Sequence, residues 1–194
     1  MAGITRDSLL TLEAYGRQRP EFRARVMAHK KHRVVELGSH VRLIFEDELS
    51  VRYQVQEMLR AEKTFDENGI RHELETYSAL VPDGSNLKAT MMIEYPDPAQ
   101  RAQALVRLRG IEHRVYLQVE GFGKVEAIAD EDMERETDVK TSAVHFLRFE
   151  LSRPMIEAFR RGAAVAIGVD HPHYAARVDP LAPATQAALA LDFA

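Results

Sequence analysis

Alternation of apolar and polar residues is strongest in residues 140–151, KTSAVHFLRFEL. Successive side chains of a strand point to opposite faces, so the segment predicts a strand with two different surfaces. One face carries Ala143, His145, Leu147, Phe149 and Leu151, and the other carries Val144, Phe146, Arg148 and Glu150. Ionisable groups in a strand of this apolar character are costly unless they are paired or used. The segment is therefore the first candidate for a functional site.

Similar patterns predict the remaining elements. Strands are expected over residues 40–46, 87–95, 113–120, 124–129 and 163–169, and helices over residues 21–33, 49–68, 70–80, 99–109, 156–162 and 183–193. Pro20 is expected to begin the helix over 21–33. Gly121-Phe122-Gly123 separates two alternating runs and predicts an antiparallel hairpin. This order favours an α+β fold: one domain over residues 1–194, with a mostly antiparallel or mixed sheet of about six strands and helices packed mainly on one side.

Composition narrows the classes of function. The 194 residues include no cysteine, which excludes disulfides, thiolate nucleophiles and cysteine-ligated iron–sulfur clusters. The net charge of -4 gives no basic field for nucleic acid, and no apolar run reaches the length of a membrane span. The first residues do not resemble a signal peptide. We expect a cytoplasmic protein that binds neither nucleic acid nor membrane, and the sequence leaves a homodimer open.

Candidate binding residues lie on three predicted elements. Arg148 and Glu150 suit an anion-binding fork with its supporting carboxylate, or an ion pair on the solvent face of the sheet. Glu57 and Arg60 are spaced to pair on a helix, and Lys30 belongs to the basic run HKKHR at residues 29–33. That run suits contact with phosphate or an acidic partner, or a solvated face. With His145, these residues form the predicted binding set.

A metal site is the alternative. His29, His145, Asp170 and His171 offer imidazole and carboxylate ligands for a divalent metal such as iron, manganese or zinc, with Glu57 or Glu62 as a further carboxylate. Each histidine has an equally simple structural interpretation, as a hydrogen-bonded core or turn residue. The acidic run DEDMERETDVK lacks the glycine and glutamate of a calcium loop. No phosphate-binding loop, GxSxG or HExxH motif occurs.

Long segments carry a family resemblance. They are RPEFRARVMAHKKHR, FEDELSVRYQVQEMLRAEKTF, VPDGSNLKATMMIEYPDP, RLRGIEHRVYLQV, KTSAVHFLRFEL and AIGVDHPHY, at residues 19–33, 45–65, 81–98, 107–119, 140–151 and 166–174. Together the chain resembles an uncharacterised bacterial family of domain-of-unknown-function proteins. Its genes often lie beside rubrerythrin and an iron–sulfur oxidoreductase resembling heterodisulfide reductase. The resemblance implies a redox or peroxide-stress setting but no catalytic residues.

Two hypotheses follow from the residues and the resemblance. In the first, the chain is an accessory or ligand-binding protein that interacts with an iron–sulfur oxidoreductase or rubrerythrin. In the second, it is a non-haem metal-dependent enzyme with histidine and carboxylate ligands. A third hypothesis is haem binding through His145 or His171. The orientation of the strand decides between them: a groove beside Arg148 and Glu150 favours recognition, and histidines meeting beneath helices favour metal.

Overall fold

The computed structural model describes residues 4–132 and 135–194. Over these residues the chain forms two antiparallel sheets together with six α-helices, which confirms the α+β class. The strands number nine in this part of the chain and divide between two sheets, where the sequence predicted about six in one. No helix within the described ranges has the length and apolar character needed to cross a bilayer.

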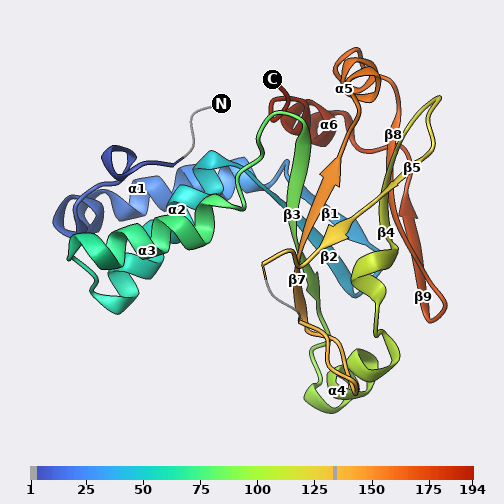
Figure 1. Ribbon diagram of the computed structural model, residues 1–194, viewed down its shortest axis with the longest axis horizontal. Coiled ribbons are helices and arrows are strands. Elements are labelled where there is room, and N and C mark those ends of the chain that lie inside the picture. Colours follow the sequence, from blue (N-terminus) through green and yellow to red (C-terminus); the bar gives the residue numbers. More distant parts are fainter. Residues whose placement is uncertain (1–3, 133–134) are drawn as a thin grey trace.

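The first sheet has five strands and the second has four. In spatial order, the first contains β1 (Val34–Leu37), β2 (Val41–Glu46), β3 (Asn86–Ile93), β7 (Val144–Glu150) and β6 (Ile128–Ala129). The second contains β5 (Lys124–Glu126), β4 (Val115–Val119), β8 (Val165–His171) and β9 (Tyr174–Val178). Figure 1 shows the sheets facing each other, with β7 and β3 near the middle of the molecule.

The predicted hairpin at residues 113–129 joins the two sheets. Strands β4 and β5 pair antiparallel, as expected. The second arm then changes sheets at Ala127, because β6 pairs with β7 instead of β4. The amide of Ala127 still donates to the carbonyl of Val115 at 2.8 Å, which fixes the crossing point. Residues just after this crossing are thereby brought against β7.

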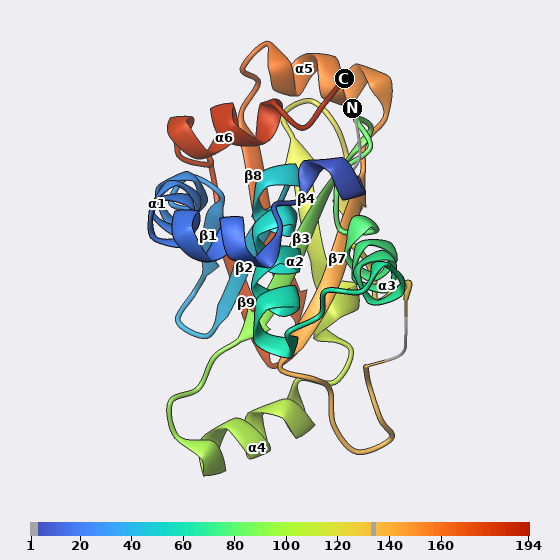
Figure 2. The ribbon, with the colours of Figure 1, turned by 90° about the vertical axis from the view of Figure 1, so that its left-hand side faces the viewer.

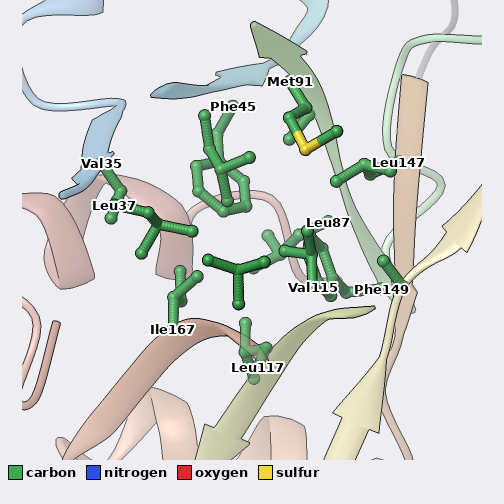
Figure 3. Packing of buried hydrophobic residues seen from close by; sticks show 14 of the residues in the cluster. Val35, Leu37, Phe45, Leu87, Met91, Val115, Leu117, Leu147, Phe149 and Ile167 are labelled. Carbon is green, nitrogen blue, oxygen red and sulfur yellow. The ribbon is translucent and has the colours of Figure 1, made fainter. Parts of the chain in front are cut away.

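The main core lies between the sheets. Apolar side chains from β1, β2, β3 and β7 meet those of β4 and β8, as Figure 3 shows for Phe45, Leu87 and Phe149 opposite Leu117 and Ile167. Alternation accounts for this: from Leu87 onward in β3, and throughout β7, every second side chain is buried, and its neighbours point away from the second sheet. Burial of this continuous apolar layer is the main stabilising contribution to the fold.

A helical layer covers the outer face of the five-stranded sheet (Figures 1 and 2). It contains α1 (Leu12–Lys30), α2 (Glu48–Glu62) and α3 (Glu67–Ser78), and the short helix Arg6–Ser8 packs against α3. These helices share a separate apolar cluster that includes Leu9, Val51, Val55, Leu59 and Ile70. Helices α5 (Arg153–Arg160) and α6 (Pro183–Ala190) lie at one end of the sandwich, and α4 (Pro98–Arg107) lies at the other (Figure 1).

Several predicted boundaries are wrong for local reasons. Helix α1 continues through Pro20 instead of beginning there, and the residue four positions earlier, Gly16, has no side chain to add to crowding at the ring. The helix expected over residues 49–68 ends at Glu62, where Lys63 adopts a left-handed conformation with φ of 55°. The strand expected over residues 163–169 begins at Val165 and continues to His171, and a hairpin joins it to β9.

Candidate functional site

Strand β7 separates its ionisable residues onto two faces, as the alternation predicted. His145 is fully buried and points into the space between the sheets. The Arg148 side chain is 24% exposed and points outward, beneath the helical layer. Because residues an odd number of positions apart on a strand point to opposite faces, His145 and Arg148 cannot belong to one pocket. The strand therefore supports two independent polar clusters.

The inner cluster surrounds His145 with acceptors. Its Nδ1 lies 2.5 Å from Oδ2 of Asp130, and its Nε2 lies 2.9 Å from the Thr141 hydroxyl and 3.1 Å from the carbonyl of Ser142. The Thr141 hydroxyl donates to the carboxylate of Glu112 at 3.2 Å. Carbonyl and carboxylate oxygens only accept, so both ring nitrogens are placed to donate. This geometry holds the His145 ring between the buried carboxylate of Glu112 and the partly buried carboxylate of Asp130.

The same cluster contains the one group of metal-ligand type that converges within the described ranges. Ligand atoms of Glu112, Asp130 and His145 lie within 4.8 Å of one another. The two carboxylates, however, approach opposite nitrogens of the ring: Asp130 meets Nδ1, and Glu112 lies 3.8 Å from Nε2. A single ion bound to one nitrogen would require one carboxylate to move across the ring.

The other predicted metal ligands have separate partners. His29 contacts the carboxylate of Asp47 at the start of α2. Asp170 lies 3.5 Å from the ammonium of Lys124, and Nε2 of His171 donates to the carbonyl of Arg109 at 3.0 Å. The described residues thus bring His145 together with Glu112 and Asp130, not with His29, Asp170 or His171.

The outer cluster is centred on Arg148. Its guanidinium makes two 2.8 Å hydrogen bonds to Glu131 and a 2.5 Å bond to Glu150. Glu150 also accepts from the Ser85 hydroxyl and the Asn86 amide. Hydrogen bonds from Arg148 hold the pKa of Glu131 below its usual range, and Glu131 holds the pKa of Arg148 above its own. The predicted ion pair is present, with Glu131 as a partner that the sequence did not indicate.

A cavity of about 620 Å³ lies beside this cluster, between the helical layer and the outer face of the sheet. We call it the α3–β7 groove. Its sheet side includes Lys88, Phe146 and Arg148, and its helical side includes Gln54 of α2, Thr76 and Tyr77 of α3, and Leu80. Glu131, Asp132 and Arg135 line a third side. The volume falls in the range of small-molecule sites, and the lining mixes aromatic, aliphatic and polar groups.

The remaining predicted binding residues lie outside this groove's lining. Glu57 accepts from Arg19 at 2.7 and 2.8 Å and from the Tyr15 hydroxyl at 2.6 Å. Arg19 accounts for most of the lowering of the Glu57 pKa to about 2. Arg60 is exposed, and Lys30 lies 3.9 Å from Glu46. Glu62, the further carboxylate of the metal alternative, is exposed near the end of α2. Through its hydrogen bonds with Tyr15 and Arg19 of α1, Glu57 joins α2 to α1.

Sequence reasoning also missed the burial of Arg33. This residue ends both the helix expected over residues 21–33 and the basic run HKKHR, yet it is 1% exposed and follows the end of α1. It donates to the carbonyls of Phe45, Glu46 and Ala188 and to the carboxylate of Asp192. Burial raises the pKa of Asp192 to about 6, although Arg33 opposes the shift. This network anchors the chain after α6 to β2.

These features define an α+β protein with a two-sheet core, a helical layer on one face and a groove between them. A family model described as "Protein of unknown function (DUF3501)" matches residues 3–193, and the chain belongs to this family. A solved protein of unknown function from Burkholderia pseudomallei K96243 is 57% identical, with a TM-score of 0.93 and 100% of each chain covered. No curated protein matches the chain.

Proposed function

We propose that the protein is an accessory ligand-binding protein whose binding site is the α3–β7 groove. The observation that carries the proposal is the 620 Å³ cavity bordered by Arg148, with apolar and polar side chains on facing walls. A cleft of this size, lined by apolar side chains with a few polar groups among them, is typical of small-molecule binding sites. Here the helices have their own apolar cluster, so the groove is framed on both sides by independently packed layers.

The biological setting that we propose follows from the family resemblance. The protein acts in the cytoplasm within a bacterial redox or peroxide-stress system, beside an iron–sulfur oxidoreductase or rubrerythrin. The chain has no cysteine, so an iron–sulfur cluster in such a system would belong to the partner. Immobilised protein should retain one purified partner, the oxidoreductase or rubrerythrin encoded in the same genome. Failure to retain either would contradict this setting without affecting the groove.

Native mass spectrometry of freshly isolated protein tests the groove itself. The wild-type chain should carry a small molecule that denaturation releases. The variant Thr76→Trp should carry much less, because Thr76 lines the groove on α3 and its hydroxyl donates to the carbonyl of His72 in the same helix. Glu75→Trp is the control, since Glu75 is exposed and lies outside the lining. Equal loading of both variants, or an empty wild-type chain, would contradict the proposal.

A metal-dependent enzyme is the second candidate, and the convergence of Glu112, Asp130 and His145 favours it. Iron, manganese or zinc bound there would supply Lewis-acid chemistry, with His145 and one carboxylate as ligands. Elemental analysis of protein purified without chelator tests this directly. About one equivalent of metal that is lost in His145→Asn and kept in His171→Asn would support it. A metal-free, fully folded protein would contradict it.

A further inference from the structure

The groove contains polar groups that the protein leaves without a partner. Among the residues described, the Gln54 amide and the Tyr77 hydroxyl have no hydrogen-bonding partner, although both line the groove. Most charges in the lining are already neutralised: Arg148 by Glu131 and Glu150, and Arg135 by Asp132. Few polar groups of the lining therefore remain available to hydrogen-bond with a ligand.

Lys88 is the positively charged side chain of the lining that forms no ion pair with the residues described. Its ammonium donates to the carbonyl of Ala79 at 2.6 Å, which uses one of its three donors. Within the part of the chain that the structure describes, no carboxylate lies within 4.0 Å of this ammonium. In the sheet Lys88 stands directly opposite Arg148, and both side chains face the groove. Arg148 is already paired with Glu131 and Glu150, whereas Lys88 keeps two of its three donors for an incoming anionic group.

The rest of the lining is suited to an apolar body. Phe146 is half-buried on the floor and carries the guanidinium of Arg135 at 4.6 Å from its ring centroid. Leu80 and the ring of Tyr77 lie on the helical side. Aromatic side chains bury large apolar areas and favour offset-stacked or edge-to-face contacts, so a flat apolar group suits the rings of Phe146 and Tyr77.

We propose that the groove binds an organic acid: a single carboxylate placed at Lys88, hydrogen bonds from Gln54 and Tyr77, and an apolar, preferably aromatic, body over Phe146. This deepens the proposed function and rests on it. The acidic side chains Asp83, Glu131 and Asp132 in the lining do not attract such a ligand. Glu131 and Asp132 accept hydrogen bonds from Arg148 and Arg135, which balance their charges. Hydrogen bonds from Ser85 and Asn86, together with the nearby charge of Lys88, lower the pKa of Asp83, so Lys88 offsets part of that negative charge.

Three matched probes test the charge preference: 2-naphthylacetate, 2-(2-naphthyl)ethanol and 2-(2-naphthyl)ethylamine. Isothermal titration calorimetry should show that the acid binds at least about tenfold more tightly than the alcohol, because a charge-assisted hydrogen bond distinguishes them. The amine should bind most weakly. Tighter binding of the amine would show that the acidic side chains dominate and would overturn the proposal. Equal binding of all three, or no binding, would overturn it too.

Two variants locate the effect. Lys88→Met keeps the aliphatic stem and should lose about tenfold in affinity for the acid while leaving the alcohol unchanged. Arg42→Met is the control: Arg42 lies on the same outer face, pairs with Glu36 at 2.7 Å and does not line the groove. An equal loss in both variants would mean only general electrostatics and would contradict the proposed contact. Thermal unfolding of each variant confirms that it is folded.

The two proposals fail in different ways. If wild-type protein carries a native small molecule that Thr76→Trp excludes, but shows no preference for the naphthyl acid, the groove is a binding site for another chemical class. If neither a native molecule nor any probe occupies the groove, the proposed function itself is wrong.

Discussion

The ionisable residues on the two faces of β7 differ in burial and in their surroundings. On the inner face, His145 is fully buried and hydrogen-bonded to Asp130, Thr141 and Ser142, and solvent reaches this cluster at the partly buried Asp130. On the outer face, Arg148 is partly exposed, paired with Glu131 and Glu150, and beside a cavity. Buried pairs are costly to break and exposed pairs contribute little to stability. We therefore propose that the inner face of β7 serves stability and that its outer face serves recognition.

The largest expected effect comes from two phenylalanines on opposite faces. Phe149 is fully buried between the sheets, and Phe146 is half-buried in the groove. Phe149→Ala should lower the free energy of unfolding by about 3–5 kcal/mol because it leaves a cavity in the core. Phe146→Ala should cost less than about 2 kcal/mol. Urea unfolding of both variants measures the difference, and equal costs would contradict the division of faces.

Breaking the inner cluster should cost almost as much. His145→Ala removes the ring that lies between the carboxylates of Asp130 and Glu112. The change leaves a cavity at a fully buried position and takes away hydrogen-bonding partners of Asp130 and Thr141, so it should cost about 3 kcal/mol or more. The same unfolding assay applies at neutral pH. A cost below about 1 kcal/mol would mean that His145 is not held between these carboxylates as the geometry indicates.

The outer pair should contribute much less. Arg148→Met should lower the free energy of unfolding by about 1 kcal/mol or less, because its partners remain partly exposed. The loss should shrink further in 1 M salt, which screens exposed charges. A loss as large as that of His145→Ala would place Arg148 in the stabilising core rather than in the binding face.

The smallest expected effect is the pH dependence of the stability that the Glu131–Arg148 pair contributes. The pKa of Glu131 is lowered by Arg148, so this pair stabilises the fold above the usual glutamate range and loses that contribution as pH falls through the lowered pKa. Glu131→Gln should therefore differ from wild type at neutral pH and converge with it in acid. Unfolding curves collected from pH 7 to pH 3 test the sign. A gap that widens in acid would contradict it.

The sequence was enough to predict the α+β class, the hairpin and the two faces of β7, because each depends on local alternation. It was not enough to predict the partners. Glu112 lies in a short helical turn, Ile111–Arg114, and Asp130 begins an acidic run whose carboxylates looked equivalent. Both reach His145 only because the chain changes sheets at Ala127, a crossing that the residue pattern does not reveal. The signal that was available is the position of Asp130, immediately after an alternating strand.

The groove could not be predicted for a related reason. It exists because α1–α3 pack mainly on one another while β3 and β7 pack mainly on the second sheet. Amphipathic patterns show that each helix has an apolar face but not which surface that face meets. Arg33 illustrates the same limit: its place in a basic run predicted exposure, whereas tertiary contacts bury it against Asp192.

A crystal structure of the protein with 2-naphthylacetate tests the central claim most directly. The account predicts the naphthyl ring between Phe146 and Tyr77, with the carboxylate within hydrogen-bonding distance of the Lys88 ammonium, and an inner cluster at His145 that does not change. A ligand bound against His145, or bound elsewhere with the groove left open, would contradict the assignment of recognition to the outer face of β7.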